Sequence, residues 1–587
     1  MTPPVPEPAA VPNTGKRVQT GFLETHRPHI ATWAIGALIF FHRPFTTGFD
    51  SLNGDQGDVR LIALIHEHLF KAMTGVGSWN SPNFFYPTKN VLGYSDTFAL
   101  NEIFYVPLRL IGFDRYVAMQ WTFILLSVVG FFGMTLLIEK STKLPRLWVC
   151  CLATTFTFAN SLSMKNRHPQ MYSVYWLPWV VLAFIVAAKT VSDRKRCALC
   201  FGGGGLLAMV LYSSFYVGWF AIFALGIFTI FFSVLEIVSS GAPSYFQKVS
   251  RQLNRVAAAL FGFGLGLLPF LYTYLPVLGA TERRAYSVAM GFAGRPGDLL
   301  NVSKWNVLWG PLAERLISSA AVPTRLIDQE TALAVTPVLL VVTVGFGLYS
   351  FRVKRSERTQ RANAVIALTF TLAVLTVVSI KFAFGSLWIV PYSVLPGANA
   401  LRAIHRIQVF NGFIAVLTLG LGLDLWRANA VNRADSSPKQ LTSASPEVSM
   451  IRPTRSTRYV RLISALLLIV TFEQLNTNNL ATLDHSDEVR LLSVIADPPK
   501  SCRQFYALGR PGDRFEVVQI DAMIIASVKR IPTLNGYSGQ FPKSFPVDAA
   551  SPGYPDAMRA WAKQRGMTTG LCTLDLATRH WTSNADS

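Results

Sequence analysis

Charged side chains are scarce in this sequence, and acidic ones most of all. It holds 33 Asp and Glu residues against 54 Lys and Arg residues in a chain of 587. All charged residues together make up 15% of the chain and apolar residues 51%, whereas soluble domains are roughly a quarter charged. So little charge cannot cover a soluble protein of this length. We therefore expect lipid to be the solvent for most of the chain.

The sequence also lacks the short motifs of several large enzyme classes. It has no GxxxxGK[ST] phosphate loop, no HExxH zinc helix and no GxSxG nucleophile elbow. ATP-driven transport, metalloprotease and serine-hydrolase chemistry therefore have no support. Cysteine is rare as well, and the CxxC of Cys197 and Cys200 has no second ligand pair. We interpret these two residues as apolar packing rather than a zinc or redox site.

What the sequence does have is long apolar runs. Runs of about 17 to 25 residues recur along it, and about eleven of them have the length that a helix needs to cross a ~30 Å hydrocarbon core. We expect crossings at 28–46, 116–138, 147–163, 171–188, twice within 197–239 with a turn near Ser213 and Ser214, then at 256–279, 331–350, 364–384, 404–426 and 459–475.

Basic residues cluster at alternate ends of these runs, which is the positive-inside pattern of membrane proteins. The formal net charge of +21 therefore indicates topology and contact with lipid headgroups, and not nucleic-acid binding. The predicted fold class is an all-α polytopic membrane protein with a small C-terminal α+β domain outside the cytoplasm. The expected location is the bacterial inner membrane.

This topology divides the chain into five parts. We expect a disordered cytoplasmic tail at 1–27, a transmembrane domain at 28–426 with outer loops at 47–115 and 280–330, a cytoplasmic linker at 427–458, a last crossing at 459–475 and an extracytoplasmic domain at 476–587.

The C-terminal domain has no apolar run long enough to cross a membrane. Its run FEVVQIDAMIIASV is interpreted as β-type structure bounded by Gly, Pro and Asp. Cys502 and Cys572 both fall in this domain, which the topology places in an oxidising compartment. We therefore expect a disulfide between them.

An acidic cluster follows the first expected helix. The stretch FDSLNGDQGDVRL places Asp50, Asp55 and Asp58 just outside the membrane. From Asp58 onward apolar residues recur at helical spacing, which predicts an amphipathic helix in the outer interface. A carboxylate at its start is explained by an N-cap alone, but a cap accounts for one carboxylate and not for a cluster with His66 and His68 nearby. The alternative is that an Asp acts as general base on a hydroxyl, or that Asp55 and Asp58 hold a divalent metal such as Mg or Mn.

Motifs spread over most of the chain resemble those of a known family. The resemblance is carried by the Asp cluster together with NSPNFFYPTKNVLGYSD (Asn80–Asp96), RHPQMYSVYWLPWV (Arg167–Val180), PGANALRAIHR (Pro396–Arg406) and NGYSGQFP (Asn535–Pro542). In this order they are similar to the bacterial multi-spanning glycosyltransferases of the GT-C superfamily. The resemblance implies an inverting enzyme that moves a sugar from a polyprenyl-phosphate donor on the outer leaflet to a lipid, glycan or protein acceptor, with an Asp of the first outer loop as base. The resemblance implies no particular cofactor.

The family's acidic pattern is matched only in part. Val59 stands where better-known members have a second acid, so Asp55 is expected to supply what that acid does. We rank Asp58 and Asp55 first as the catalytic carboxylates and Asp50 third.

A donor phosphate needs cations on the outer side, against the positive-inside bias. Arg402 and Arg406 are four residues apart and so share one helix face, where they are suited to grip a phosphate. Lipid headgroups or loop carboxylates are equally good partners for them. Arg283 and Arg284 are weaker candidates of the same kind.

Further site candidates are His66, His168, Gln170 and Tyr94. The NGYSGQFP motif is open to two interpretations, a saccharide-binding turn or a loop that docks the C-terminal domain.

Two other functions compete with a glycosyltransferase. A transporter or flippase would suit many crossings and an intramembrane charge such as Lys381, but we find no inverted repeat and the polar residues gather outside the midplane. A non-catalytic assembly protein would keep the fold without the base.

Overall fold

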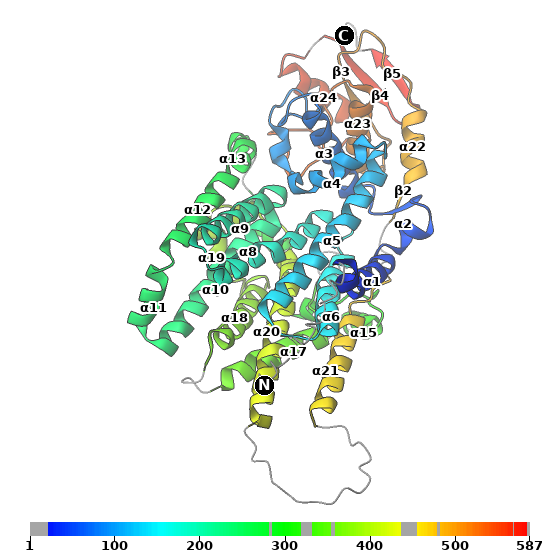
Figure 1. Cartoon of the computed structure of the whole chain (residues 1–587). Coiled ribbons are helices and arrows are strands. Elements are labelled where there is room, and N and C mark those ends of the chain that lie inside the picture. The colour runs from blue at the N-terminus through cyan, green and yellow to red at the C-terminus, as the bar shows by residue number, and fades with distance from the viewer. Residues whose placement is uncertain are drawn as a thin grey trace, which may run out of the picture.

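The computed structural model describes residues 22–280, 284–318, 332–353, 358–435, 455–477, 482–567 and 569–583. Helices dominate it, and a small sheet lies at the C-terminal end (Figure 1). The strands and α-helices within residues 51–110 and 482–583, which we call the outer layer after the expected topology, gather at one end of the molecule (Figure 1). The ends of α20 and α21 that flank residues 436–454 lie at the other end (Figure 1).

Seven helical segments of the described residues are long and apolar enough to cross a membrane. They are Arg115–Ser141, Pro169–Lys189, Asp193–Ser213, Phe215–Ser240, Leu253–Val277, Gln360–Val378 and Ile404–Ala430. The chain is therefore a multi-pass membrane protein. Four more helices lie where the remaining crossings were expected: α1 (Phe22–Phe40), α6 (Arg146–Thr157), α17 (Pro337–Arg352) and α21 (Arg455–Phe472). The total of eleven stays a prediction.

These segments correspond to α5 (Arg115–Ser141), η3 (Pro169–Trp176) with α8 (Leu177–Lys189), α9 (Asp193–Ser213), α10 (Phe215–Ser240), α12 (Leu253–Gly266) with α13 (Leu268–Tyr274) and η4 (Leu275–Val277), α18 (Gln360–Val378), and η8 (Ile404–Arg406) with α20 (Ile407–Asp435). Shorter connecting elements are α2 (His42–Thr46), η1 (Val91–Tyr94), η2 (Ala99–Asn101), α7 (Asn160–Ser163), α11 (Ala242–Ser250), α14 (Tyr286–Gly291), η5 (Pro296–Leu300), α15 (Gly310–Ser318), α19 (Ile389–Val394) and η7 (Ala398–Ala400).

The turn between α9 and α10 falls at Ser214, where the sequence predicts it. Residues of the loop that precedes η2 hydrogen-bond to the backbone groups that lose their helical partners at this break. Phe98 N donates to Ser213 O at 2.9 Å, and Asp96 Oδ1 accepts from Phe215 N at 2.7 Å. The break therefore fixes Asp96 at the first turn of α10, since buried backbone groups must find partners.

Helix α9 packs closely on α12 through small residues. A Cβ on Gly204 would lie 2.0 Å from the Ala259 carbonyl oxygen, and one on Gly262 would lie 2.0 Å from that of Phe201. Only glycine allows this approach of two backbones, a common device between membrane helices.

The outer layer joins the first outer loop to the C-terminal segment. It contains β1 (Ser51–Asn53), α3 (Asp58–Met73), α4 (Glu102–Leu110), β2 (Thr482–Asp484), α22 (His485–Ser493), β3 (Gln504–Leu508), α23 (Phe515–Lys529), α24 (Tyr554–Lys563), β4 (Leu571–Asp575) and β5 (His580–Ser583). Strand β1 pairs antiparallel with β2, and β4 lies between β3, its parallel neighbour, and β5, its antiparallel one. Two parts of the sequence more than 400 residues apart therefore form one structural layer.

Helix α23 corrects one expectation, because FEVVQIDAMIIASV is helical and not a strand. Apolar residues on most of its circumference are buried, since the helix contacts both β3 and α3. Burial on several sides removes the one-faced pattern that identifies a helix, and length is then the better guide.

Helix α3 begins at Asp58 as expected, but other parts of the protein bury most of it, so it is not an exposed amphipathic helix. Its polar residues Arg60, His66 and Glu67 are buried together with its apolar ones. The C-terminal segment covers the polar face of the helix, which the amphipathic pattern assigned to solvent: Arg60 donates to Glu488 at 2.9 Å and to Asp521 at 2.5 Å. The sequence pattern missed this burial because the covering residues lie far away along the chain.

The expected linker and tail are shorter than we assigned. Helix α20 continues to Asp435 and α21 begins at Arg455, so residues 427–435 and 455–458 are helical. Residues 436–454 lie outside the described residues, as do residues 1–21 of the expected tail.

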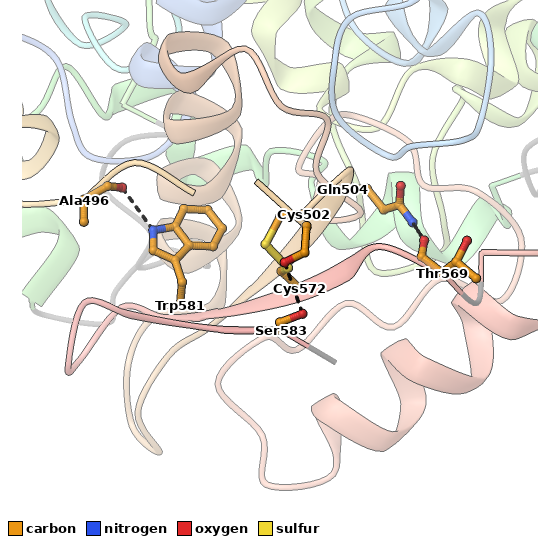
Figure 2. The surroundings of a disulfide bond; sticks show 8 residues. Ala496, Cys502, Gln504, Thr569, Cys572, Trp581 and Ser583 are labelled. Carbon is orange, nitrogen blue, oxygen red and sulfur yellow. Dashed lines mark hydrogen bonds between the residues drawn. A yellow bond between two sulfur atoms is a disulfide. The ribbon is translucent and has the colours of Figure 1, made fainter. Parts of the chain in front are cut away.

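Cys502 and Cys572 form a disulfide whose Cα atoms are 5.6 Å apart, shown in Figure 2. Cys572 belongs to β4, and Cys502 lies just before β3, so the bond ties the start of one strand to its neighbour. Nearby, Trp581 Nε1 donates to the Ala496 carbonyl oxygen at 3.0 Å (Figure 2). The other four cysteines are free.

Candidate active site

A cavity of about 1010 Å³ lies where the outer layer meets α9, α10, α12 and α13. One part of its wall is polar and includes Asp58, Asp96, Gln170, Arg402 and Arg406. The other part is apolar and is formed by Leu211, Phe215, Trp219, Ile222, Phe263, Leu267, Phe270 and Leu271. A few convergent polar groups in a largely apolar cavity are typical of a ligand site.

Asp58 reaches this cavity because it is the first residue of α3. His168 Nδ1 lies 2.8 Å from Asp58 Oδ2, from the turn before η3. The N-cap of α3 is Gly57 and makes no side-chain cap. Asp55 serves the helix start instead, since its Oδ1 accepts from Gly57 N at 3.1 Å and from Val59 N at 3.4 Å. The capping role therefore belongs to Asp55, and Asp58 is left facing His168 and the cavity.

The two carboxyl groups also differ in their electrostatics. Burial acts to raise the pKa of Asp58, but the His168 hydrogen bond and the charges of His168, Arg406 and Arg402 together bring it below its usual value. Burial raises the pKa of Asp55, and the charge of Asp58 adds to this. The surroundings of Asp58 therefore favour its ionised form, which a proton acceptor needs.

Two cations face Asp58 from the segment before α20. The Arg406 guanidinium is buried and lies over the Tyr216 ring at 5.2 Å, while that of Arg402 lies over the Phe292 ring at 4.8 Å. With its amide turned to suit its neighbours, Gln170 accepts from Arg406 Nη1 at 3.2 Å. Aromatic rings thus hold both guanidinium groups at the cavity wall.

Arg284 also lines the cavity, but its guanidinium bridges two loops. It donates to the carbonyl oxygens of Ala400, at 2.6 Å, and of Gly539. Burial lowers the pKa of Arg284, and the charge of Arg402 acts in the same direction. Its phosphate-binding role stays a prediction. Arg283 lies outside the described residues.

Two of the expected site residues lie away from the cavity. Asp50 is exposed, and its carbonyl oxygen accepts from His485 N at 2.8 Å. His66 is buried between α3 and α4, where its Nδ1 lies 2.6 Å from Glu102 Oε1 and its ring stacks on Tyr105 at 4.8 Å. Neither is among the cavity-lining residues, whereas Tyr94 is.

Asp96 is the site residue that the sequence reasoning missed. It lines the cavity beside Asp58 and accepts from the first backbone N–H of α10. Burial raises its pKa to about 6, and its interactions with Phe215 and Arg406 oppose that rise. A signal was present, since Asp96 ends the LGYSD stretch quoted for the family resemblance.

The donor set does not fit a divalent cation. Among the described residues no group of three or more His, Cys, Asp and Glu side chains is arranged to hold one. Asp58 pairs with His168, and Asp55 Oδ2 lies 3.8 Å from Arg167 Nε. Positive charge already surrounds both carboxyl groups, so a metal bound there would meet electrostatic repulsion.

Comparison with solved structures identifies the architecture. The oligosaccharyltransferase AglB of Archaeoglobus fulgidus, solved with an inhibitory peptide and a dolichol-phosphate, superposes with a TM-score of 0.51 at 11% identity, over 94% of this chain and 70% of that one. The chain has a GT-C fold. The mycobacterial arabinofuranosyltransferase AftD (TM-score 0.47, 13% identity, 94% of this chain and 32% of that one) and ArnT from Cupriavidus metallidurans bound to undecaprenyl phosphate (0.38, 11%, 87% and 86%) are further similar structures. No family model matches the sequence, and no curated protein matches it.

Within this GT-C fold, separate stretches of the sequence converge on one cavity. LGYSD supplies Gly93–Asp96, PGANALRAIHR supplies residues from Pro396 to Arg406, and NGYSGQFP supplies Tyr537–Phe541. The tertiary structure thus brings together the segments that carried the family resemblance.

Proposed function

We propose that this protein is a glycosyltransferase that moves a sugar from a polyprenyl phosphate to a hydroxyl of a lipid, glycan or protein acceptor. The reaction is assigned to the outer face of a bacterial inner membrane, with the N-terminus in the cytoplasm and the C-terminal domain outside. One observation carries the proposal: the carboxylate of Asp58 and two guanidinium groups, Arg402 and Arg406, share a cavity that also has a large apolar wall.

Asp58 is assigned as the general base. His168 holds the carboxylate by its hydrogen bond and leaves the second carboxylate oxygen for the acceptor. The acceptor oxygen attacks C1 of the sugar while Asp58 takes its proton. The bond from C1 to the phosphate oxygen breaks, its electron pair goes to that oxygen, and the configuration at C1 inverts. Such proton transfer contributes about 10² to 10⁴ in rate.

Arg402 and Arg406 are assigned to the phosphate. Charge on the leaving phosphate grows as the C1–oxygen bond breaks, so fixed guanidinium groups stabilise the transition state more than the ground state. Their aromatic supports hold them in place before the donor binds. Fixed donors of this kind need no reorganisation during the reaction.

The apolar wall is assigned to the polyprenyl chain. It is formed mainly by α10, α12 and α13. These helices expose many large apolar side chains to the surroundings, among them Leu225, Phe261, Leu268 and Leu271. Exposed apolar surface on membrane helices faces lipid. A lipid tail is therefore able to enter the cavity from the bilayer while its phosphate reaches the arginines.

The test uses the full chain, purified and placed in lipid nanodiscs with a panel of undecaprenyl-phosphate-linked sugars. We expect release of undecaprenyl phosphate with at least one donor when a membrane glycan extract supplies the acceptor. Asp58→Asn is expected to abolish release, and Asp50→Asn, at an exposed carboxylate outside the cavity, to keep it. Lipid-linked sugar that crosses the bilayer of proteoliposomes without any release would instead establish a flippase.

A second test addresses the phosphate site by direct binding of sugar-free undecaprenyl phosphate. Arg402→Glu is expected to weaken binding about 10- to 100-fold, because charge-assisted hydrogen bonds contribute roughly 1.5 to 3 kcal/mol. Arg490→Glu is the matched control, since this arginine is 74% exposed on α22 and lies outside the cavity. Equal affinities of the two variants would contradict the assignment.

A further inference from the structure

The NGYSGQFP motif has no part in the mechanism above, yet its first residues are held by many contacts. Asn535 is completely buried, and its side-chain amide is fully engaged. Its Oδ1 accepts from Ala507 N at 2.6 Å, and its Nδ2 donates to Gln519 Oε1 at 2.9 Å and to the Tyr554 hydroxyl at 3.1 Å. A buried amide satisfied in this way fixes the backbone on both sides of it.

Gly536 fixes the next step of the chain. Its N–H donates to Gln519 Oε1 at 3.0 Å, and a Cβ at this position would lie 2.2 Å from the Phe85 ring. Phe85 N in turn donates to the Asn535 carbonyl oxygen at 2.9 Å. The first outer loop and the C-terminal segment thus hold the pair Asn535–Gly536 between them. These two residues are enough to dock the C-terminal segment on the loop, so docking does not require the rest of the motif.

The rest of the motif lies in the cavity wall. Tyr537, Ser538, Gly539, Gln540 and Phe541 all line it. The Tyr537 ring is half-buried and lies 6.3 Å from the Phe541 ring. These rings present an apolar surface next to the hydroxyl of Ser538 and the amide of Gln540, the combination that suits a sugar, which has apolar C–H faces and a polar edge.

Arg284 connects this wall to the phosphate side of the cavity. Its guanidinium donates both to the Gly539 carbonyl oxygen and to that of Ala400, two residues before Arg402. A side chain at Gly539 would lie 2.9 Å from the Tyr94 carbonyl oxygen. The wall is therefore held in a fixed position relative to the expected phosphate ligand.

Tyr537 lines the same cavity as Asp58 and Arg402. Burial raises the pKa of its phenol, and Asp58 and Arg402 both interact with it electrostatically. In the proposed reaction, C1 of the sugar has to lie between the hydroxyl bound at Asp58 and the phosphate bound at Arg402. A ring that lines the cavity together with both groups is therefore well placed to adjoin the sugar.

We propose that Tyr537–Phe541 is the glycosyl-binding wall of the cavity, with the Tyr537 ring against the apolar face of the donor's pyranose or furanose and Ser538 and Gln540 at its hydroxyl groups. This inference rests on the proposed function and adds to it the residues that select the sugar. Sugar recognition then belongs to the C-terminal segment, and phosphate recognition to the segment before α20.

The experiment compares two probes on purified full-length protein in nanodiscs: sugar-free undecaprenyl phosphate and undecaprenyl phosphate linked to a hexose or a pentose. The sugar-linked probe used is one that the wild-type protein binds more tightly than the bare lipid. Tyr537→Ala is expected to lower the affinity for this probe roughly tenfold, which is the scale of one lost aromatic contact. The affinity for the bare lipid is expected to stay within about twofold of wild type. Tyr537→Phe, which keeps the ring, is expected to stay near wild type. Tyr459→Ala is the matched control, since this tyrosine is half exposed on α21 and outside the cavity.

The outcomes separate this inference from the function on which it rests. The glycosyl-binding wall is overturned if Tyr537→Ala lowers the affinity for both probes equally, or lowers it for neither. The wall is also overturned if wild type binds no sugar-linked probe better than the bare lipid while Arg402→Glu still weakens the bare lipid. If wild type binds neither probe, the proposed function itself is overturned.

Discussion

Replacement of Asp58 by Asn tests the assignment of the base with little change of shape. The Asn side chain keeps an oxygen for the hydrogen bond from His168, which is 2.8 Å long in the wild type. It loses the charge and therefore the capacity to take a proton. Loss of a general base lowers kcat about 10²- to 10⁴-fold, which corresponds to roughly 3 to 5 kcal/mol of transition-state stabilisation.

The same change is expected to cost little stability. Gly57, and not Asp58, is the N-cap of α3, and Asp55 provides the hydrogen bonds to the helix start. What is lost is the favourable position of a charge at a helix N-terminus, about 0.3 to 1 kcal/mol, and part of the His168 bond, about 1 kcal/mol. The melting temperature should therefore fall by a few degrees at most, while turnover nearly disappears.

The assay is single-turnover release of undecaprenyl phosphate at a saturating donor concentration, together with thermal unfolding in the same detergent. Because the pKa of Asp58 is held below its usual value, wild-type turnover should fall only as the pH drops below the normal range of an Asp. The stability that this depressed pKa provides is present above the unfolded pKa near 4 and is lost as pH falls through the folded value. Full activity of Asp58→Asn, or a larger loss of kcat in Asp55→Asn, would refute the reasoning.

Three further predictions concern stability. Burial raises the pKa of Asp96 in the folded state to about 6, so the stability of the wild type falls as pH rises from about 4 through 6. Asp96→Asn should therefore be more stable than wild type by roughly 1 to 3 kcal/mol at pH 8 and equally stable at pH 4. Thermal unfolding at both pH values measures the difference. Arg60→Met leaves two buried carboxylates without their cation and should cost about 3 to 5 kcal/mol, whereas the exposed control Arg490→Met should cost under about 1 kcal/mol; equal costs would contradict this. Replacing Cys502 and Cys572 by Ser opens a loop spanning 70 residues and should cost about 4 kcal/mol in the chain-entropy model; an unchanged melting temperature under oxidising conditions would contradict it.

Features encoded by local pattern were accessible from the sequence. The turn at Ser214, the start of α3 at Asp58 and the positions of the long apolar helices agree with the structure. Each depends on residues within a few turns of one another, because the length of an apolar run and the position of a break are local properties. The pairing of Cys502 with Cys572 was accessible for a related reason, since topology left two cysteines in one compartment.

Features that depend on distant partners were not accessible. Arg60 has the spacing of a solvent-facing residue, and it is buried because Glu488 and Asp521, more than 400 positions later in the chain, neutralise it. The buried run of α23 was interpreted as a strand for the same reason. The helix packs against α3 as well as β3, so it has no single apolar face.

The composition of the site shows the same division. By itself the sequence determined that this is a membrane protein and that an acidic cluster follows its first helix, because hydrophobic length and local charge need no partner to be recognised. Only the tertiary structure showed which carboxylates share the cavity. It placed Asp55 at the helix start, left Asp50 and His66 outside the cavity lining, and brought Asp96 and Tyr537 into the same cavity as Asp58. Convergence in space depends on how helices far apart in the chain pack together, and the order of residues along the chain does not state it.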